Sequence, residues 1–432
     1  MMGSLGHLLV GLIDDIMVGR LGPIELAATS LGNSLIFIAL SIGIGFSFAI
    51  TPLIAESDGE KDIEKGRGIF QHGMILMTIL GVSLYVMLLF LKPLLNYLDQ
   101  PEEVVVLAIP YYEIVALSMI PLMIFQGLKQ FTDGLSLTKY AMYATIVTNV
   151  ANMILNFALI YGIWIFPRLE IVGAALGTLL SRFVMISFMI FVMKKSGKFD
   201  AYLVKLKFVE IKKSFFRKIM KLGFPTALQM LFEVGLFTAS ILLAGTLGAF
   251  SQAANQIALK LTSTTFMIAV GIGVAAMVRV GNQKGLKNYK ELRRIAFSNF
   301  LLILIIMFTF SIGFIALKDV LPYVFTDNLE VIEIASGLLI IAGFFQLSDG
   351  LQAVILGGLR GLQDVNVPSG LTFIAYWIIG FPVSYYLGTM AGFGTFGIWI
   401  GLLVALTSSA LMLFIRFNYL TNKLIKENNE IT

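Results

Sequence analysis

The stretch from Ile295 to Leu317, IAFSNFLLILIIMFTFSIGFIAL, contains 23 residues and no Asp, Glu, Lys or Arg. At a rise of 1.5 Å per residue, a helix of this length crosses the roughly 30 Å hydrocarbon core of a lipid bilayer. Apolar runs of similar length recur along the whole chain and predict an all-α polytopic membrane protein with twelve transmembrane helices. The expected spans are residues 1–22, 28–55, 68–91, 105–128, 139–163, 171–193, 219–246, 252–282, 295–317, 331–359, 367–389 and 393–415.

The overall composition supports a chain embedded in lipid. Of 432 residues, 58% are hydrophobic and 13% are charged, and the mean hydropathy is +0.89. Soluble domains carry roughly 25% charged residues. The chain has no cysteine and only two histidines, His7 and His72, which excludes thiolate sites and argues against a histidine-based metal centre. No cleavable signal peptide is visible, because the chain opens almost directly into apolar sequence.

Lys and Arg residues are distributed unevenly between the loops. With the N-terminus placed inside the cell, 25 of the 31 basic residues fall on the cytoplasmic face and four on the opposite face; Arg182 and Lys260 lie inside spans. The positive-inside rule therefore places both termini in the cytoplasm of a cell whose inner (plasma) membrane holds the protein. The basic segment 194–221 is interpreted as a determinant of topology and a lipid headgroup contact, rather than as a nucleic-acid site.

The two halves of the chain are related by a repeated offset. Residues 17–22 (MVGRLG) match 243–248 (LAGTLG) with a shift of 226, and the same shift carries Gln126–Gly162 onto Gln352–Gly388 without a gap. Chance matching of apolar sequence is the alternative. A true repeat predicts two pseudo-symmetric six-helix bundles that can rock around a central cavity. The repeat also makes the first helix look short, so a few residues are expected to be missing before it.

The repeat and the basic linker give a domain plan. The expected parts are an N-lobe, a basic cytoplasmic linker, a C-lobe and a cytoplasmic tail, at residues 1–193, 194–218, 219–416 and 417–432. Because only a short turn around Gly248 separates the seventh and eighth helices, a count of eleven helices is the alternative to twelve.

Polar side chains in the N-lobe spans suggest a cation site. A charged group at mid-bilayer costs roughly 2.5–3.5 kcal/mol and needs an explanation. Asp14 lies midway along the first helix, Asn152 and Asn156 share one face of the fifth, and Thr178 lies on the sixth. A carboxylate with amide and hydroxyl oxygens suits a small hard cation or a titrating proton. The alternative is a hydrogen-bonded cluster that only packs helices together.

A second group of polar residues lies in the C-lobe spans. Glu233 on the seventh helix and Asp349 on the tenth are acidic, and Gln256 and Lys260 are one turn apart on the eighth. Acids among aromatic and Met side chains can bind an organic cation through charge and cation–π contact. The alternative is that Lys260 pairs with an acid in a purely structural contact.

Motifs of soluble chemistry can be set aside. The glycine pairs Gly43 and Gly45, and Gly271 and Gly273, lie within spans and predict close helix packing rather than phosphate binding. No Ser/His/Asp or Cys/His arrangement is available to build a hydrolase. The chain is therefore not expected to be an enzyme or to hold a resident cofactor or metal.

Several motifs, in order along the chain, resemble one transporter family. GLIDDIMVGRLGPIELAA (11–28), LGFPTALQMLFEVGLF (222–237) and FFQLSDGLQAVILGGLRGLQD (344–364) look like its first, seventh and tenth helices, and NMILN (152–156) and GAALGT (173–178) also fit. The family is the multidrug and toxic compound extrusion (MATE) family, and the likeness is greatest to its NorM-like branch. It implies two six-helix bundles that expel amphiphilic, often cationic compounds by Na+ or H+ antiport.

Carried over by position, the resemblance implies two sets of site residues. Asp14, Asn152, Asn156 and Thr178 would form an N-lobe cation site, and Glu233 and Asp349 a C-lobe acidic site. Two departures matter. Asp15 adds a second acid after the first-helix aspartate, and Lys260 could neutralise the acids of the C-lobe.

The leading hypothesis is a secondary active multidrug efflux transporter. It would exchange Na+ or H+ for amphiphilic, cationic organic compounds by alternating access of two lobes, and would work as a monomer among membrane lipids. The second hypothesis is a flippase of a lipid or a lipid-linked saccharide. Such cavities usually display several Arg or Lys residues. The predicted spans here contain only two basic residues, Arg182 and Lys260, against four acids. A channel fits the two repeats and the buried acids poorly.

Overall fold

The computed structural model describes residues 14, 16–97, 100–163, 166–203 and 212–431 of the chain. In this part the regular structure is entirely helical, and eleven helical stretches are long and apolar enough to cross a membrane. They coincide with the second to twelfth predicted spans, which confirms the all-α polytopic fold class. The predicted first helix, 1–22, lies mostly outside the described residues, although residues 14 and 16–19 are helical.

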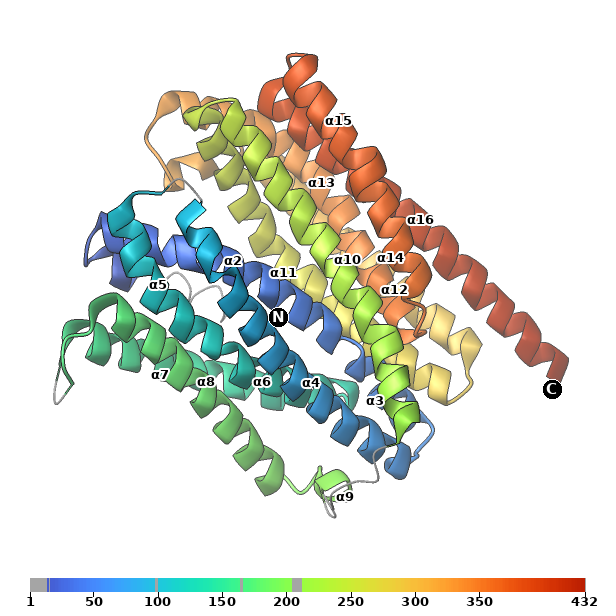
Figure 1. The fold of residues 1–432 in the computed structure, drawn as a ribbon. Helices are drawn as coiled ribbons and strands as arrows, with labels where there is room; N and C mark the ends of the chain where they lie inside the picture. The colour runs from blue at the N-terminus through green and yellow to red at the C-terminus, as the bar shows by residue number, and fades with distance from the viewer. Residues whose placement is uncertain (1–13, 15, 98–99, 164–165, 204–211, 432) are drawn as a thin grey trace. The chain divides into compact units, whose positions relative to one another are not determined.

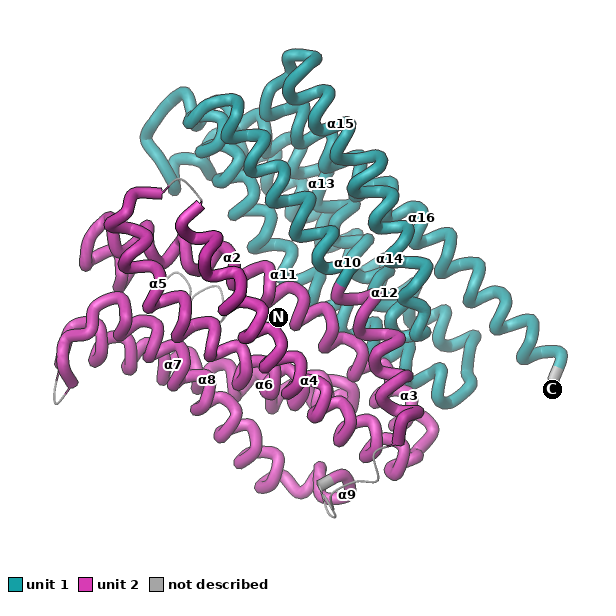
Figure 2. Tube along the Cα trace, viewed as in Figure 1, with its two compact units in different colours: residues 1, 228–432 teal, residues 2–227 magenta. Residues whose placement is uncertain are grey.

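The chain divides into two compact units (Figure 2), residues 2–227 and residues 228–432, which we call the N-unit and the C-unit. Within the N-unit, α7 packs against α8, α4 against α6, and α2 against α5 (Figure 1). The helices of this unit are α2 (Pro23–Ser47), α3 (Ile50–Gly59), α4 (Ile63–Leu91), η1 (Lys92–Tyr97), α5 (Glu102–Leu117), α6 (Met119–Gly134), α7 (Lys139–Tyr161), α8 (Glu170–Lys195) and α9 (Asp200–Leu203).

The C-unit is organised around α13, which packs against α11, α12 and α16. The boundary between the units falls inside α10, so this helix belongs to both. The elements that follow the N-unit helices are α10 (Lys213–Thr246), α11 (Ala249–Gly285), α12 (Tyr289–Ala316), η2 (Leu321–Val324), α13 (Leu329–Gly361), α14 (Asn366–Phe373), η3 (Ile374–Gly380), α15 (Phe381–Tyr385), η4 (Tyr386–Met390) and α16 (Gly394–Ile431).

The turn between α10 and α11 settles whether these helices are separate. Gly248 has φ of 110°, a conformation that a residue with a side chain rarely adopts, and it breaks the helix between Thr246 and Ala249. The seventh and eighth spans are therefore distinct helices. The interpretation that merges them into one is wrong.

The repeat found in the sequence reappears in the positions of the helices. α2 begins at Pro23 and α11 at Ala249, and α4 begins at Ile63 and α12 at Tyr289, so each pair is separated by 226 residues. The N-caps of α4 and α12 are also alike. The side chain of Asp62 accepts a hydrogen bond from the N–H of Lys65, and the side chain of Asn288 accepts one from the N–H of Glu291. Each cap satisfies an N–H group that the first turn leaves unpaired.

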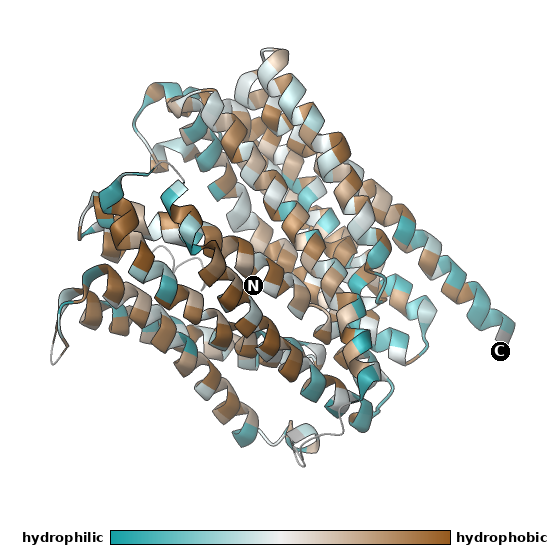
Figure 3. Ribbon diagram, in the orientation of Figure 1, coloured by the Kyte–Doolittle hydropathy of each residue, from teal (hydrophilic) through white to brown (hydrophobic). Residues whose placement is uncertain are grey.

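The surface of α12 shows which solvent the helices face. Leu301, Ile305, Phe308 and Ile312 are each more than half exposed and lie on one face of the helix at spacings of four, three and four. The opposite face is buried, with Ile303 and Met307 in the core of the C-unit. A stripe of large apolar side chains facing outward is stable in lipid rather than in water. Figure 3 shows hydrophobic residues along the helices, with hydrophilic ones gathered near the C-terminal end of α16.

The last helix is longer than its predicted span. The sequence predicts an end near residue 415, but α16 continues to Ile431 because no Gly or Pro follows to stop it. Arg293 on α12 also donates to the side-chain oxygens of Asn418 and Asn422, which ties the extension to its neighbour.

Candidate functional site

The N-unit contains a chain of hydrogen-bonded polar side chains between its helices. Asn156 donates from Nδ2 to Asp14 Oδ1 at 2.6 Å and lies 3.4 Å from Asn152 Oδ1, while Asn152 Nδ2 lies 3.5 Å from Ser181 Oγ. Asn152 and Asn156 are one turn apart on α7 and are 3% and 0% exposed. The structure therefore brings together three of the four residues expected in this lobe, and adds Ser181 to them.

A glycine on α8 leaves the space that Asn156 occupies. A Cβ atom at Gly177 would lie 1.9 Å from Asn156 Oδ1, so no larger residue fits there without displacing the amide. Among the described residues, Asn156 Oδ1 is buried without a hydrogen-bond donor. A buried oxygen left without a donor is costly unless a further ligand reaches it.

Arg182 is a residue that the sequence reasoning did not place at this site. It follows Ser181 on α8, its guanidinium donates to Ser118 Oγ, and it interacts electrostatically with the Asp14 carboxylate. Ser118 lies at the junction of α5 and α6, where the helix is interrupted. Arg182 and Asp14 are 168 positions apart in the chain, so nothing local in the sequence linked them.

Thr178 lies one turn before Arg182 on α8. Its carbonyl oxygen accepts a hydrogen bond of 2.9 Å from Ser181 Oγ. Within the described ranges its hydroxyl group makes no hydrogen bond to the polar chain, so the structure places Thr178 beside the chain rather than in it. Asp15 and His7 lie outside the described residues.

The C-unit holds a larger polar cluster, made of residues from α10, α13, α14 and η3. Arg360 Nη2 donates to Gln229 Oε1 at 2.9 Å, and Gln229 Nε2 donates to Thr372 Oγ1 at 3.1 Å. Glu233, one turn after Gln229, interacts electrostatically with Arg360 and with Asp349. Gln352 on α13 donates to the hydroxyl of Tyr376. We call this set the C-unit cluster: Gln229, Glu233, Asp349, Gln352, Arg360, Thr372 and Tyr376.

Comparison with known proteins shows the family to which the chain belongs. A sequence model of the MatE family matches residues 1–158 and 225–386. The chain belongs to the MatE family. The two matched stretches begin 224 residues apart, close to the 226-residue shift of the repeat.

Relatives of this MatE-family member match it along almost its whole length. The probable multidrug resistance protein NorM of Rhizobium meliloti is 34% identical, over 96% of this chain and 90% of the relative. The multidrug resistance protein NorM of Photobacterium profundum is 31% identical, over 97% and 93%. The resemblance to MATE proteins of the NorM-like branch is thereby confirmed.

Solved structures share the fold of this MatE-family member. A MATE transporter in the bent conformation superposes with a TM-score of 0.91 at 21% identity, covering 99% of this chain and 94% of the other. The eukaryotic MATE transporter AtDTX14 gives a TM-score of 0.86 at 19% identity, covering 98% and 95%. The family consists of transporters rather than enzymes, and this chain is a multi-pass membrane protein.

Two of the residues expected in the C-lobe site lie on a helix that contributes no residue to the C-unit cluster. Gln256 and Lys260 on α11 are both exposed. Across the described residues, the ion pairs do not include a contact between Lys260 and an acid, so the alternative of a structural Lys260–acid pair is not observed. The basic residue that interacts electrostatically with Glu233 is Arg360. The predicted span 331–359 ends just before Arg360, but this residue lies in the last turn of α13.

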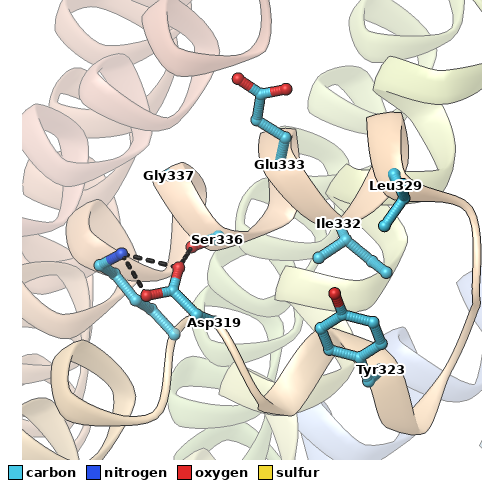
Figure 4. Close-up of a pocket in the computed structure, with 8 residues that line it drawn as sticks. Asp319, Tyr323, Leu329, Ile332, Glu333, Ser336 and Gly337 are labelled. Carbon is cyan, nitrogen blue, oxygen red and sulfur yellow. Dashed lines mark hydrogen bonds and ion pairs between the residues drawn. The ribbon is translucent and has the colours of Figure 1, made fainter.

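A separate pocket opens in the C-unit between η2 and α13. Its volume is about 450 Å³, and Asp319, Tyr323, Glu333 and Ser336 help to line it. The hydrogen bonds from Lys318 and Ser336 lower the pKa of the exposed Asp319 carboxyl (Figure 4). Glu333 points away from Asp319 in this view, so the two carboxylates do not converge on a common ligand.

No group of three or more His, Cys, Asp or Glu side chains in the described part of the chain is arranged to hold a metal ion. The two polar interiors, one in each unit, hold the buried polar residues that the sequence analysis singled out, and they are our candidates for the transport site. The N-unit chain offers one carboxylate and amide oxygens. The C-unit cluster offers two carboxylates and a guanidinium.

Proposed function

We propose that this protein is a secondary active multidrug efflux transporter that exchanges Na+ or H+ for amphiphilic, cationic organic compounds. Its relatives are named multidrug resistance proteins, and it matches them over nearly its full length. The observation that carries the coupling is the N-unit chain, where the Asp14 carboxylate is bound by Asn156 next to the unpaired oxygen of the same amide.

The chemistry of the N-unit chain suits a cation that comes and goes. Carboxylate and amide oxygens are the ligands of small hard cations, and a carboxylate can take up a proton in the same place. Arg182 interacts with Asp14 electrostatically but donates its hydrogen bond to Ser118. The positive charge of Arg182 thus helps to stabilise the charge of Asp14 when no cation is bound.

Coupling follows if the two ligands favour different states of the protein. A ligand shifts a conformational equilibrium only by its difference in affinity between the two states. In this proposal, the cation at Asp14 favours the state that releases drug outward. Drug bound from the cytoplasm favours the state that releases the cation inward. In this proposal both termini lie on the cytoplasmic side of the plasma membrane, as the positive-inside rule favours, and a single chain is the working unit.

The charges of the two interiors favour cationic cargo over the anionic headgroups of a flippase. Arg182 interacts electrostatically with Asp14, and Arg360 with Glu233. Asp349 remains as a further acid in the C-unit cluster. Among the described residues, neither interior therefore carries an excess of positive charge that would attract an anionic lipid.

The test uses dye efflux in everted vesicles with Na+ and pH gradients imposed separately. The Asp14→Asn variant should lose gradient-driven transport while remaining folded. Glu113→Gln is the matched control, because it removes a negative charge from an exposed ion pair with Lys92 in the same unit. Gradient-driven transport that persists in Asp14→Asn would refute the coupling role.

A further inference from the structure

His72 is the one histidine among the described residues, and it lies fully buried in the first half of α4. Its Nδ1 atom is 2.7 Å from the carbonyl oxygen of Gly68, and its Nε2 atom is 3.0 Å from the backbone nitrogen of Lys212. The carbonyl can only accept a hydrogen bond, and the backbone N–H can only donate one. The imidazole is therefore neutral, with its proton on Nδ1 and its acceptor Nε2 facing Lys212.

Two aromatic rings from the first turn of α10 cover this imidazole. The ring centroids of Phe215 and Phe216 lie 5.2 Å and 5.0 Å from that of His72. Phe215 also lies over Gly68, where a Cβ atom would come within 2.8 Å of its ring. Gly68 thus serves twice, because its carbonyl fixes the tautomer of His72 and its missing side chain leaves room for Phe215.

These contacts bind the start of α10 to the N-unit. Lys212 immediately precedes α10, the helix whose later part belongs to the C-unit. A second contact follows, since Lys218 Nζ lies 3.3 Å from Glu56 Oε2 on α3. His72 differs from this ion pair, because histidine is the side chain whose charge ordinarily changes between pH 5 and 8.

The charged groups nearest to His72 are bound to one another. Glu56 is 3.3 Å from Lys65 of α4 as well as from Lys218. On α6, Asp133 is bound by Lys129 at 2.8 Å. These pairs leave the imidazole without a fixed charge that would hold it protonated.

The remaining charges of the neighbouring elements are also accounted for. Arg67 of α4 pairs with Glu64 at 2.7 Å and donates to a carbonyl of α9. Lys92 and Glu113, on η1 and α5, bind each other at 2.7 Å beyond the far end of α4. The other charged side chains of α3, α9 and the start of α10 are the half-buried Asp58 and the exposed Asp200, Lys212, Lys213 and Arg217.

We propose that His72 is a pH-sensitive anchor, which binds the start of α10 to α4 when it is neutral and releases it when it is protonated. A second proton on the ring would sit on Nε2 and point at the N–H of Lys212, so that two donors face each other. The charged ring would then need water, because a buried charge without a partner is costly. Water reaches it only if the turn that carries Phe215 and Phe216 moves away. This inference does not depend on the proposed function.

The direction of the pH effect follows from the neutral ring of the anchored state. Anchoring is complete at high pH and is lost as the pH falls, because only the released state takes up the proton. A histidine in water has a pKa of about 6.5, so anchoring should weaken about tenfold between pH 7.5 and pH 5.5. Acidification on the side of the membrane where α10 begins should therefore free its first turn.

The experiment measures hydrogen–deuterium exchange of residues 212–219 in the full-length protein at pH 7.5 and 5.5. Rates are corrected for the pH dependence of exchange in unstructured peptides, and size-exclusion profiles establish that each variant is folded. In the wild type, protection should fall about tenfold at the lower pH. His72→Gln retains an acceptor and does not titrate, so its protection should be the same at both pH values. His72→Phe keeps a ring but has no acceptor, so its protection should be low at both.

The matched control is His7→Gln, because His7 is the only other histidine of the chain. This variant should keep the pH dependence of the wild type. It also leaves His72 as the single histidine, so nitrogen-15 NMR of the labelled ring should show a neutral imidazole protonated on Nδ1 at pH 7.5.

Four results would overturn the proposal. They are protection that does not change with pH in the wild type, a wild-type pH dependence in His72→Gln, loss of that dependence in His7→Gln, and a neutral ring that carries its proton on Nε2.

Discussion

In the N-unit, one carboxylate at Asp14 accepts a hydrogen bond from Asn156, and the nearby Arg182 donates to Ser118. In the C-unit, Glu233 interacts electrostatically with Arg360 and with a second acid, Asp349. The helices of the two units nevertheless begin at positions related by the same 226-residue shift. The repeat thus preserves the frame of helices, while the polar interiors have become specialised.

The backbone differs between the units in a way that matches this specialisation. The helix of α7 is regular, whereas the corresponding stretch of the C-unit contains two π-helical segments, η3 and η4. Tyr376 of the C-unit cluster lies in η3. Under the 226-residue shift, Tyr376 corresponds to Val150 on α7. Short π-helical segments often occur at functional sites, because they rotate the side chains that follow.

Charged residues near the ends of α6 and α13 also differ in their partners. Lys129 and Asp133, four residues apart near the end of α6, bind each other at 2.8 Å. Arg360 and Asp364 have the same spacing near the end of α13, but Arg360 donates to Gln229, and Asp364 is bound by Arg416. Under the 226-residue shift Arg360 corresponds to Gly134 rather than to Lys129, so the basic residue of the interior cluster is particular to the C-unit.

The largest expected difference in stability concerns close helix packing. A Cβ atom at Gly357 would lie 2.1 Å from the backbone oxygen of Gly273, which cannot move away, whereas at Gly43 it would meet the flexible Met123 side chain. Gly357→Ala should therefore destabilise the protein by about 3 kcal/mol, at the upper end of typical overpacking costs. Gly43→Ala should cost less than half as much. Thermal unfolding in detergent measures both, and equal losses would contradict this distinction.

A smaller effect is expected where Arg182 meets the interrupted helix of the N-unit. Ser118→Ala removes the acceptor of the buried guanidinium, and hydrogen bonds to charged groups contribute about 1.5–3 kcal/mol. The melting temperature should fall accordingly. Ser34→Ala is a control of the same size, because the Ser34 hydroxyl bonds only the carbonyl of Leu31 in its own helix. A Ser118→Ala loss no greater than the control would show that Ser118 does not anchor Arg182.

The two repeated caps should behave alike. Asp62→Ala and Asn288→Ala each leave a first-turn N–H group without its acceptor, which costs about 1 kcal/mol. We expect matching falls in melting temperature for the two variants. A cap that contributes in only one unit would break the structural equivalence of the repeat at this position.

The smallest effect is expected at the C-unit pocket between η2 and α13. Because hydrogen bonds lower the pKa of Asp319 in the folded state, its contribution to stability is fully present above the unfolded pKa of an aspartate, and is lost as the pH falls through the lower folded value. Asp319 is exposed, so the effect is small. Asp319→Asn should remove this part of the pH dependence of the melting temperature. An unchanged pH profile would contradict the assignment.

Much of the fold could be predicted from the sequence, because lipid imposes long apolar helices and the repeat fixes where they begin. The spans from 28–55 to 393–415 all correspond to observed helices. The extension of α16 to Ile431 was missed, since hydropathy identifies the part of a helix that lies in lipid rather than the helix itself.

The candidate sites were harder to predict. The spacing of Asn152 and Asn156 placed them on one face of a helix, and they do lie together. The partners of the acids could not be found in this way, because Arg182, which interacts electrostatically with Asp14, lies in a distant part of the chain. Arg360 stands at the end of an apolar run, so the sequence counted it with the loop, although its long side chain turns back toward Gln229.

The central claim is that the protein exports drug in exchange for a cation that binds at Asp14. Because coupling between two ligands is reciprocal, a drug gradient alone must drive the cation the other way. Proteoliposomes of the wild-type protein loaded with ethidium should take up H+ or Na+ as the dye leaves, and those of Asp14→Asn should not. Cation uptake of equal extent in both would contradict the account.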